Sequence, residues 1–226
     1  NTSICFKKYD LNMDEELSII DTKTRNEKIK NFLVQNKKLL ILSITVVIII
    51  ILSFYSFQIY EDKHREKISE KFNSAVIEYE KGNTSKSTQA LIEVIEDRNS
   101  TYSPLALYFV VDNNLIKNQT EVNELFDILI HKTSLENEIR YLIIYKKALY
   151  NADTIEENDL LQILKPLINS ESIWKSHGLY LLAEYFFSKN EKQKAKDFFS
   201  QIISLESANQ EIVKESQKRL NRDLSD

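Results

Sequence analysis

The strongest hydrophobic feature of the chain is an apolar run near its start. Residues 39–60, LLILSITVVIIIILSFYSFQIY, carry no charge across 22 positions. As a helix that rises about 1.5 Å per residue, this run is long enough to cross the roughly 30 Å hydrocarbon layer of a membrane. A surface helix of a soluble domain keeps a polar face, whereas this run is uncharged all round. The pattern therefore predicts one transmembrane helix, with the lipid bilayer as its partner.

A cleaved signal peptide is the competing interpretation of this run. Its apolar region would span only about 7 to 15 residues and would end at a small-x-small cleavage site, and no such site follows Leu52. Tyr55, Phe57 and Tyr60 instead lie where aromatic side chains meet a membrane interface. We therefore expect an uncleaved signal anchor.

Hydrophobic residues beyond this run recur with helical spacing. Leu179, Leu182, Ala183 and Phe186 stand at i, i+3, i+4 and i+7, which is one face of a helix. After the polar break SKNEKQ, a second stripe consists of Ala195, Phe198, Phe199, Ile202 and Ile203. Two stripes around a short break predict a helix hairpin, in which the two alanines allow close packing.

Similar pairs of stripes occupy three earlier segments, which begin FNSAVIEYEKGN, PLALYFVV and ENEIRYLI. Gly82 and the bend at residues 117–119 separate the helices of the first two pairs, whereas the pattern leaves the register of residues 135–169 open. A closing helix over residues 210–222 has a single apolar edge, as the cap of a helical stack requires. We expect an all-α fold: a transmembrane helix, then about four helix hairpins and a capping helix.

The hairpin spacing resembles the tetratricopeptide repeat (TPR), a 34-residue helix-turn-helix unit. With Ala195 as the second-helix alanine, the apolar residues of the last hairpin fall in register, while Ser207 replaces the terminal proline. The resemblance implies a TPR-like α-solenoid. In such a unit, first-helix positions two, five, nine and twelve face the inner groove. The implied partner-binding residues are His177, Tyr180, Glu184 and Phe187.

The residue composition excludes several kinds of catalytic and metal-binding site. The chain has two glycines among 226 residues, Gly82 and Gly178, so GxSxG, GxGxxG and Walker-type loops cannot form. Its one cysteine, Cys5, excludes an intramolecular disulfide and Cys-rich metal sites. The three histidines lack metal-ligand spacing. We expect no catalytic residue, cofactor, metal, small-molecule substrate or nucleic acid.

Charge sets the expected topology. Residues 1–38 carry eight basic and six acidic groups, and residues 61–226 carry 22 and 28. Because basic segments beside a span stay in the cytoplasm, we expect residues 1–38 to be cytoplasmic and residues 61–226 to be an extracytoplasmic domain. Residues 1–12 precede Met13 and are interpreted as an upstream extension or a non-native remnant.

A shorter amphipathic pattern lies just before the apolar run. In RNEKIKNFLVQNKK, Ile29, Phe32 and Leu33 share one side of a helix and lysines surround them. This segment either lies along the inner membrane surface or forms the start of the span. The pattern does not separate the two.

The layout of nearly the whole chain resembles the ancillary SecYEG translocon subunit family (YfgM-like). The resemblance rests on NEKIKNFLVQNKKLLIL and, after the span, on NSAVIEYEKGN, STYSPLALYFV and LYLLAEYFFSKNEKQKAKDFFSQII in the family's order. The chain departs from the family in being rich in Ile, Lys and Asn where members are often Ala-rich. The resemblance implies a non-enzymatic scaffold on a bacterial inner membrane, with residues 61–226 as a periplasmic domain. Its implied partners are Sec translocon subunits and a periplasmic chaperone of the peptidyl-prolyl isomerase type.

The expected function is therefore a membrane-anchored, TPR-like scaffold that binds proteins at the periplasmic face. A TPR adaptor for cell-envelope assembly or cell division is the alternative, because it would share the fold and differ only in its partner. A membrane-bound hydrolase is a third class, which the missing motifs disfavour.

Overall fold

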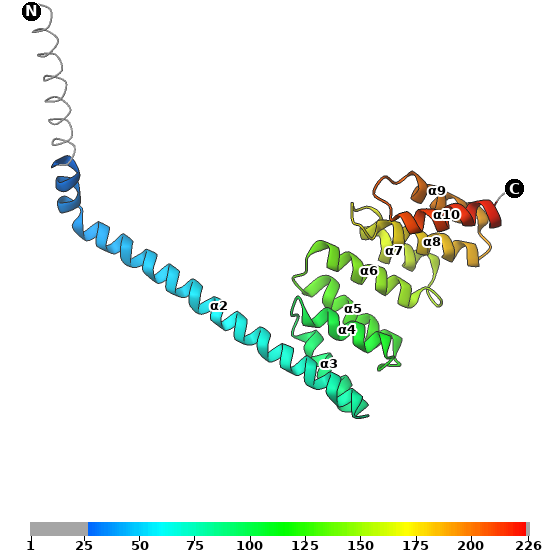
Figure 1. The fold of residues 1–226 in the computed structure, drawn as a ribbon, viewed down its shortest axis with the longest axis horizontal. Helices are drawn as coiled ribbons and strands as arrows, with labels where there is room; N and C mark the ends of the chain where they lie inside the picture. The colour runs from blue at the N-terminus through cyan, green and yellow to red at the C-terminus, as the bar shows by residue number, and fades with distance from the viewer. Residues whose placement is uncertain (1–26, 225–226) are drawn as a thin grey trace, which may run out of the picture. The chain divides into compact units, whose positions relative to one another are not determined.

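The computed structural model describes residues 27–224, which contain helices and no strand (Figure 1). The expected all-α class is confirmed for these residues. The proposed extension at residues 1–12 and most of the expected cytoplasmic segment 1–38 lie outside the described residues. The chain divides into two units, residues 1–63 and residues 64–226.

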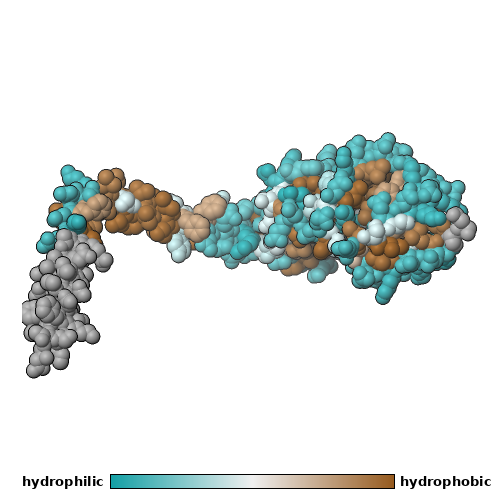
Figure 2. All heavy atoms as spheres, turned by 90° about the horizontal axis from the view of Figure 1, so that it is seen from above, coloured by the Kyte–Doolittle hydropathy of each residue, from teal (hydrophilic) through white to brown (hydrophobic). Residues whose placement is uncertain are grey.

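Helix α2, Lys37–Glu80, dominates the first unit and contains the apolar run. It is long and apolar enough to cross a membrane, and its most apolar stretch buries nothing inside the protein. Figure 2 shows hydrophobic side chains covering this stretch. Even the hydroxyls of Ser43 and Thr45 donate to carbonyls one turn earlier, both at 2.9 Å. Such internal pairing is what a helix in lipid needs, because hydrocarbon offers no hydrogen-bond partner.

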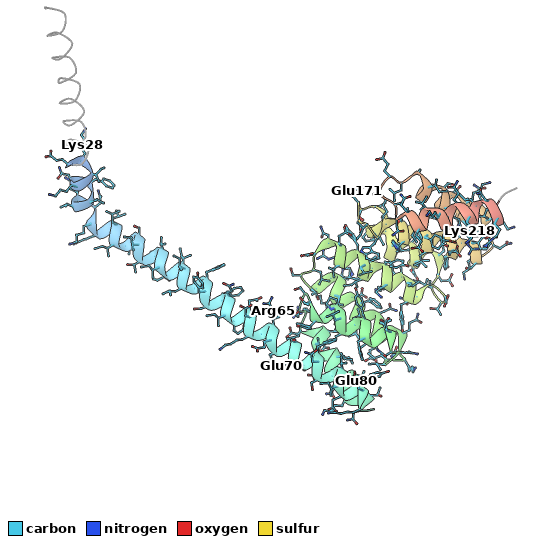
Figure 3. The ribbon with its side chains drawn as sticks, viewed as in Figure 1. Lys28, Arg65, Glu70, Glu80, Glu171 and Lys218 are labelled. Atoms are coloured by element: carbon cyan, nitrogen blue, oxygen red, sulfur yellow. The ribbon has the colours of Figure 1, made fainter. Side chains whose placement is uncertain are left out.

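The same helix continues beyond residue 60 without a break. Its later part carries charged side chains, among them Arg65, Glu70 and Glu80 (Figure 3). In the second unit, which begins at His64, this part of α2 buries Ile68 and Ala75. The predicted first helix of the first hairpin is thus the end of α2.

Eight further α-helices build the described part of the second unit. They are α3 (Thr84–Glu96), α4 (Tyr102–Asp112), α5 (Gln119–Asp127), α6 (Asn137–Asn151), α7 (Glu157–Ile168), α8 (Lys175–Ser188), α9 (Lys192–Ser204) and α10 (Gln210–Asp223). A π-helical turn, η1 (Ile128–Lys132), extends α5. Helices that follow one another pack together, most extensively α8 with α9, α3 with α4, and α9 with α10. The connections are short, so the chain runs back and forth.

The last hairpin forms as the stripes predict. Leu179, Leu182, Ala183 and Phe186 of α8 are buried, as are Ala195, Phe199 and Ile202 of α9. Ile203 differs from the expectation, since it lies exposed at the rim of the stripe. Gly178 lets α8 approach α7, because a Cβ at this position would lie 2.9 Å from Leu167 Cδ2.

A buried amide organises the segment whose register the sequence leaves open. Asn151, at the end of α6, accepts hydrogen bonds from Gln119 Nε2 (3.0 Å) and Asn123 Nδ2 (2.9 Å) of α5. Its own Nδ2 donates to Asn123 Oδ1 (2.8 Å) and to the Lys147 carbonyl (2.7 Å). Matched donors and acceptors allow this polar side chain to be buried. A hydrophobic pattern cannot reveal such a contact.

Two leucines in neighbouring helices allow a matched test of this packing. Leu164 of α7 is fully buried, whereas Leu149 of α6 is 51% exposed. We expect Leu164→Ala to lower the free energy of unfolding by about 2–5 kcal/mol, because it removes transfer free energy and leaves a cavity. Leu149→Ala should cost less than about 1 kcal/mol. Urea unfolding of the full chain in detergent, followed by circular dichroism, measures both. Equal losses would contradict the observed burial.

Candidate protein-docking surface

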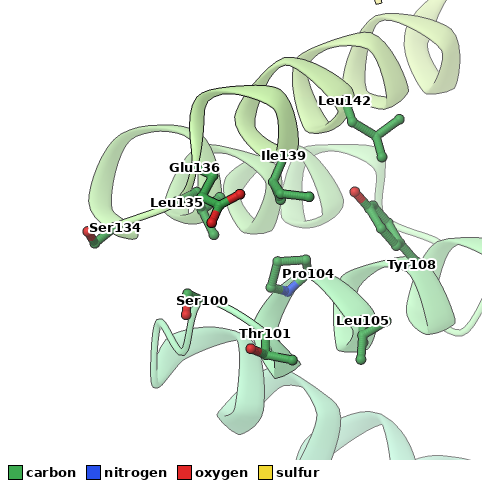
Figure 4. A pocket seen from close by; sticks show the side chains of 10 residues that line it. All are labelled: Ser100, Thr101, Pro104, Leu105, Tyr108, Ser134, Leu135, Glu136, Ile139 and Leu142. Atoms are coloured by element: carbon green, nitrogen blue, oxygen red, sulfur yellow. The ribbon is translucent and has the colours of Figure 1, made fainter. Parts of the chain in front are cut away.

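An open cavity of about 630 Å³ lies between α4 and α6. The first turns of the two helices and the segments that precede them form its walls (Figure 4). It is lined by Ser100, Thr101, Pro104, Leu105, Tyr108, Ser134, Leu135, Glu136, Ile139 and Leu142. Its size lies in the range of sites that take one small ligand or a few side chains of a partner.

The start of α4 is held firmly in place. Ser103 is buried, and its hydroxyl donates to the Val94 carbonyl of α3 at 2.6 Å. Pro104 beside it is also buried and suits a first helical turn, where a missing N–H costs nothing. Leu105, by contrast, is 44% exposed, and Ile139 of α6 is 37% exposed. Two large apolar side chains thus face the cavity from rigid helices.

Tyr108 supplies the one unusual polar group of the cavity. Its hydroxyl oxygen is buried and has no hydrogen-bond partner among the described residues. Figure 4 shows the Tyr108 side chain reaching toward α6, near Ile139 and Leu142. Burial, reinforced by the negative charge of Asp112, raises the pKa of Tyr108 to about 12. The phenol therefore stays neutral near pH 7 and keeps a proton to donate.

A lysine lies over the face of the Tyr108 ring. Lys146 Nζ of α6 sits 4.6 Å from the centroid of the Tyr108 ring. A cation over an aromatic face is attracted by the ring quadrupole, with about 0.5–1 kcal/mol at exposed sites. This contact fixes the ring and leaves its hydroxyl unengaged. The unpaired Tyr108 hydroxyl thus lies beside the exposed apolar side chains of Leu105 and Ile139 in the cavity lining.

Three of the four residues expected to bind a partner are brought together by α10. Arg219 donates from Nε to Glu184 Oε1 at 2.6 Å, and its Nη2 forms a second bond to Glu184 Oε2. Its guanidinium carbon lies 4.9 Å from the centre of the Phe187 ring. Burial and the negative charge of Glu184 raise the pKa of Tyr180, and the positive charge of Arg219 opposes this rise. This part of α8 therefore faces the chain's own last helix.

His177, the fourth expected residue, lies in a different aromatic cluster. Its ring centroid is 5.1 Å from that of Trp174 and 5.8 Å from that of Tyr145 on α6. Burial lowers the pKa of His177, so the ring is neutral near pH 7. Its Nδ1 is buried without a partner in the part of the chain that the structure describes. The partner-binding role of the four residues stays a prediction.

Leu105, Tyr108 and Ile139 were not singled out by sequence reasoning. Leu105 and Tyr108 lie in PLALYFVV, where nearly every position is apolar, so periodicity cannot distinguish a core face from an exposed one. Ile139 joins them from about 30 positions further along the chain. A proline at a helix start beside an apolar run was the one available signal, and it marks a helix rather than a cavity.

The cavity lining combines exposed apolar side chains with hydroxyl groups and the carboxylate of Glu136. The described residues hold no group of three or more His, Cys, Asp or Glu side chains that could bind a metal ion. No protein-family model, no curated protein and no solved structure matches the chain.

Two tyrosines with opposite hydrogen bonding test the state of the cavity. Tyr108→Phe removes an unpaired buried hydroxyl, so we expect it to raise the free energy of unfolding by about 1 kcal/mol. Tyr185→Phe removes the hydroxyl that donates to the Ile155 carbonyl at 3.0 Å, so it should lower that free energy by about 0.5–1.5 kcal/mol. Urea unfolding measures both. A loss of stability in Tyr108→Phe would show that its hydroxyl is already paired.

Charge holds α10 on α8, and this contact is testable by hydrogen exchange. We expect Glu184→Gln to speed amide exchange in α10 roughly fivefold, in line with about 1 kcal/mol for a partly buried bidentate pair. The matched control Lys218→Met, which loses an exposed pair with Glu215, should leave exchange unchanged.

Acid should weaken the same helix. Arg222 and Arg219 hold the pKa of Asp223 well below its usual range. Because the pKa of Asp223 is lower in the folded state, its carboxylate stabilises the fold fully above the unfolded pKa of about 4. This stabilisation is lost as the pH falls below that value. If neither Glu184→Gln nor acid changed the rate of amide hydrogen exchange in α10, these charges would not be what stabilises the helix.

Proposed function

We propose that this protein is a non-enzymatic, membrane-anchored scaffold whose helical domain binds protein partners at the periplasmic face of a bacterial inner membrane. Residues 39–60 form the span, the preceding segment is cytoplasmic, and the helices from the end of α2 to α10 form a TPR-like solenoid. The chain then acts by display: the anchor raises the local concentration of the docking surface beside membrane-bound partners.

The observation that carries this proposal is that the two parts of α2 have different surroundings. Its apolar stretch buries nothing in the protein, whereas its later part buries Ile68 and Ala75 in the core of the helical domain. An uncharged surface of this length is costly in water and stable in lipid. Joining it through one continuous helix to a domain is what an anchor for that domain requires.

The cavity between α4 and α6 supports protein binding within the same scheme. In a TPR-type arrangement, the first helix of each pair lines the inner groove, and in the proposed solenoid α4, α6 and α8 are those first helices. Exposed Leu105 and Ile139 offer apolar contact, and the Tyr108 hydroxyl offers a donor. A partner segment with a large apolar side chain and a backbone carbonyl beside it fits these groups.

The proposed partners are Sec translocon subunits and a periplasmic chaperone, as the family resemblance implies. With this assignment the protein is an ancillary translocon subunit that links the channel to chaperones. The alternative is an adaptor for cell-envelope assembly or cell division, which would use the same anchor and cavity. Only the identity of the captured protein separates the two.

Site-specific photo-crosslinking in intact membranes tests both the surface and the partner. A photoreactive amino acid at Leu105 is expected to capture translocon subunits or the chaperone, and adding Ile139→Lys should abolish capture. A probe at Leu149, which is exposed on α6 outside the cavity lining, is the matched control and should capture neither. Capture of division or envelope-assembly proteins at Leu105 would favour the alternative function. Equal capture at both positions would remove the docking role of the cavity.

Protease added to spheroplasts tests the proposed side of the membrane. We expect the domain after residue 60 to be digested from outside, while a tag on the preceding segment survives until the cells are lysed. The reverse pattern would place the domain in the cytoplasm. Complete release of the chain by carbonate would exclude the anchor itself.

A further inference from the structure

A short amphipathic helix, residues 27–35, lies directly before α2. A turn at Asn36 separates the two helical segments (Figure 1), and Figure 3 labels Lys28 on the shorter one. The Asn36 Nδ2 donates to the Phe32 carbonyl at 3.0 Å, and the same carbonyl accepts the backbone N–H of Asn36 at 3.0 Å. The turn at Asn36 thus lies between the short helix and the apolar stretch, although backbone hydrogen bonds continue through it.

Its apolar side chains form one narrow stripe. At about 100° per residue, Phe32, Ile29 and Leu33 fall within an arc of about 100°. All three are exposed in the structure. Lys28 and Lys30 lie just beyond the two edges of this arc, at about 40° and 60° from it. An apolar stripe flanked on both sides by lysines is the arrangement of a helix that lies in a membrane interface.

The remaining positions fit the same orientation. Glu27 and Asn31 lie opposite the stripe, and Gln35 lies near its edge beside Lys28. Val34 is the one apolar residue on the side opposite the stripe. The long stems of the two lysines can lie along apolar surface while their ammonium groups reach upward to polar groups. The polar side then faces water and the stripe faces the acyl chains.

We propose that residues 27–35 form an in-plane segment that binds the anionic lipid surface of the bilayer. Ile29, Phe32 and Leu33 insert at the boundary between headgroups and acyl chains, and Lys28 and Lys30 contact headgroup phosphates. This inference rests on the proposed membrane anchor, but it depends neither on the partner proteins nor on the side of the membrane on which the domain lies.

Charge and chain continuity select the bilayer as the occupant of this surface. Residues 36–38 alone separate the helix from the proposed span 39–60, so the stripe cannot be far from the same membrane. The segment supplies positive charge, which matches anionic headgroups. A continuation of the span would instead carry charges at 27, 28, 30, 37 and 38 into hydrocarbon, at several kcal/mol for those placed deepest. A helix in water would leave the stripe exposed.

Spin labels around the short helix distinguish these arrangements. The full chain carrying Cys5→Ser is reconstituted into vesicles of phosphatidylethanolamine and phosphatidylglycerol, with Ile29→Cys, Asn31→Cys, Phe32→Cys or Gln35→Cys labelled by a nitroxide. Collision with oxygen and with a water-soluble nickel complex reports depth. We expect labels at 29 and 32 to lie deeper than labels at 31 and 35, so that depth follows the helical period. A steady change of depth from 29 to 35, or four labels equally accessible to nickel, would overturn the proposal.

A charge variant tests the lipid class. With the label at position 32, Lys28→Gln combined with Lys30→Gln should lower the ratio of inserted to free helix roughly fivefold per lysine. The same loss is expected for the unaltered segment in pure phosphatidylcholine vesicles. Lys214→Gln combined with Lys218→Gln, at exposed positions of α10, is the matched control and should change nothing. Unchanged depth in both the lysine variant and phosphatidylcholine would overturn the anionic-lipid assignment.

Carbonate extraction of the same vesicles distinguishes a failure of the in-plane helix from a failure of the membrane anchor. A chain that stays with the vesicles but lacks the periodic depth pattern contradicts only the in-plane helix. A chain that washes off contradicts the anchor on which the proposed function depends.

Discussion

Helix α2 has to suit two environments with one continuous run of backbone hydrogen bonds. Over its apolar stretch every side is hydrophobic, and polar atoms such as the hydroxyl of Thr45 pair with the helix itself. After Lys63 the same helix needs only one apolar side, which Ile68, Phe72 and Ala75 provide at i, i+4 and i+7. Before Lys63 the helix is apolar on every side, and after it only one side is apolar. This change lets the later part of α2 serve as the first helix of a packed domain.

The rest of the domain builds on that stripe. The Phe72 ring lies 6.0 Å from the Tyr102 ring of α4, and the Tyr79 ring lies 5.2 Å from that of Phe109. The later helices then use small residues to approach one another: Gly178 at the contact of α8 with α7, and Ala183 within the α8 stripe. Each helix covers an apolar side that its predecessor leaves open, which explains why no single pair would be stable alone.

The parts of this fold that local periodicity encodes could be predicted, and the parts that depend on distant polar groups could not. The stripes of α8 and α9, and the positive φ of Gly82 at the first turn, follow from residues a few positions apart. The buried amide of Asn151 is satisfied by Gln119 and Asn123, which lie about 30 positions earlier. Because an asparagine in sequence looks like a loop residue, its burial inside a contact gives no local signal.

The same limit applies to the candidate surfaces. The inward positions of α8 were predicted from repeat spacing, but their engagement by Arg219 depends on a helix 35 positions away. The cavity of Leu105 and Tyr108 likewise exists only because α6 arrives beside α4. Periodicity identifies which side of a helix turns inward. It does not identify what covers that side.

The two candidate surfaces differ in whether the chain's own residues cover them. At α8 the chain supplies its own occupant, since the guanidinium of Arg219 satisfies Glu184 and stacks on Phe187. Between α4 and α6 no described residue plays that part, and a buried donor on Tyr108 is left unpaired. Such a group costs about 1–3 kcal/mol, which an incoming acceptor recovers. In the proposed binding scheme, a partner that reaches the buried Tyr108 hydroxyl would complete a hydrogen bond between α4 and α6, whereas at α8 it would first have to displace one.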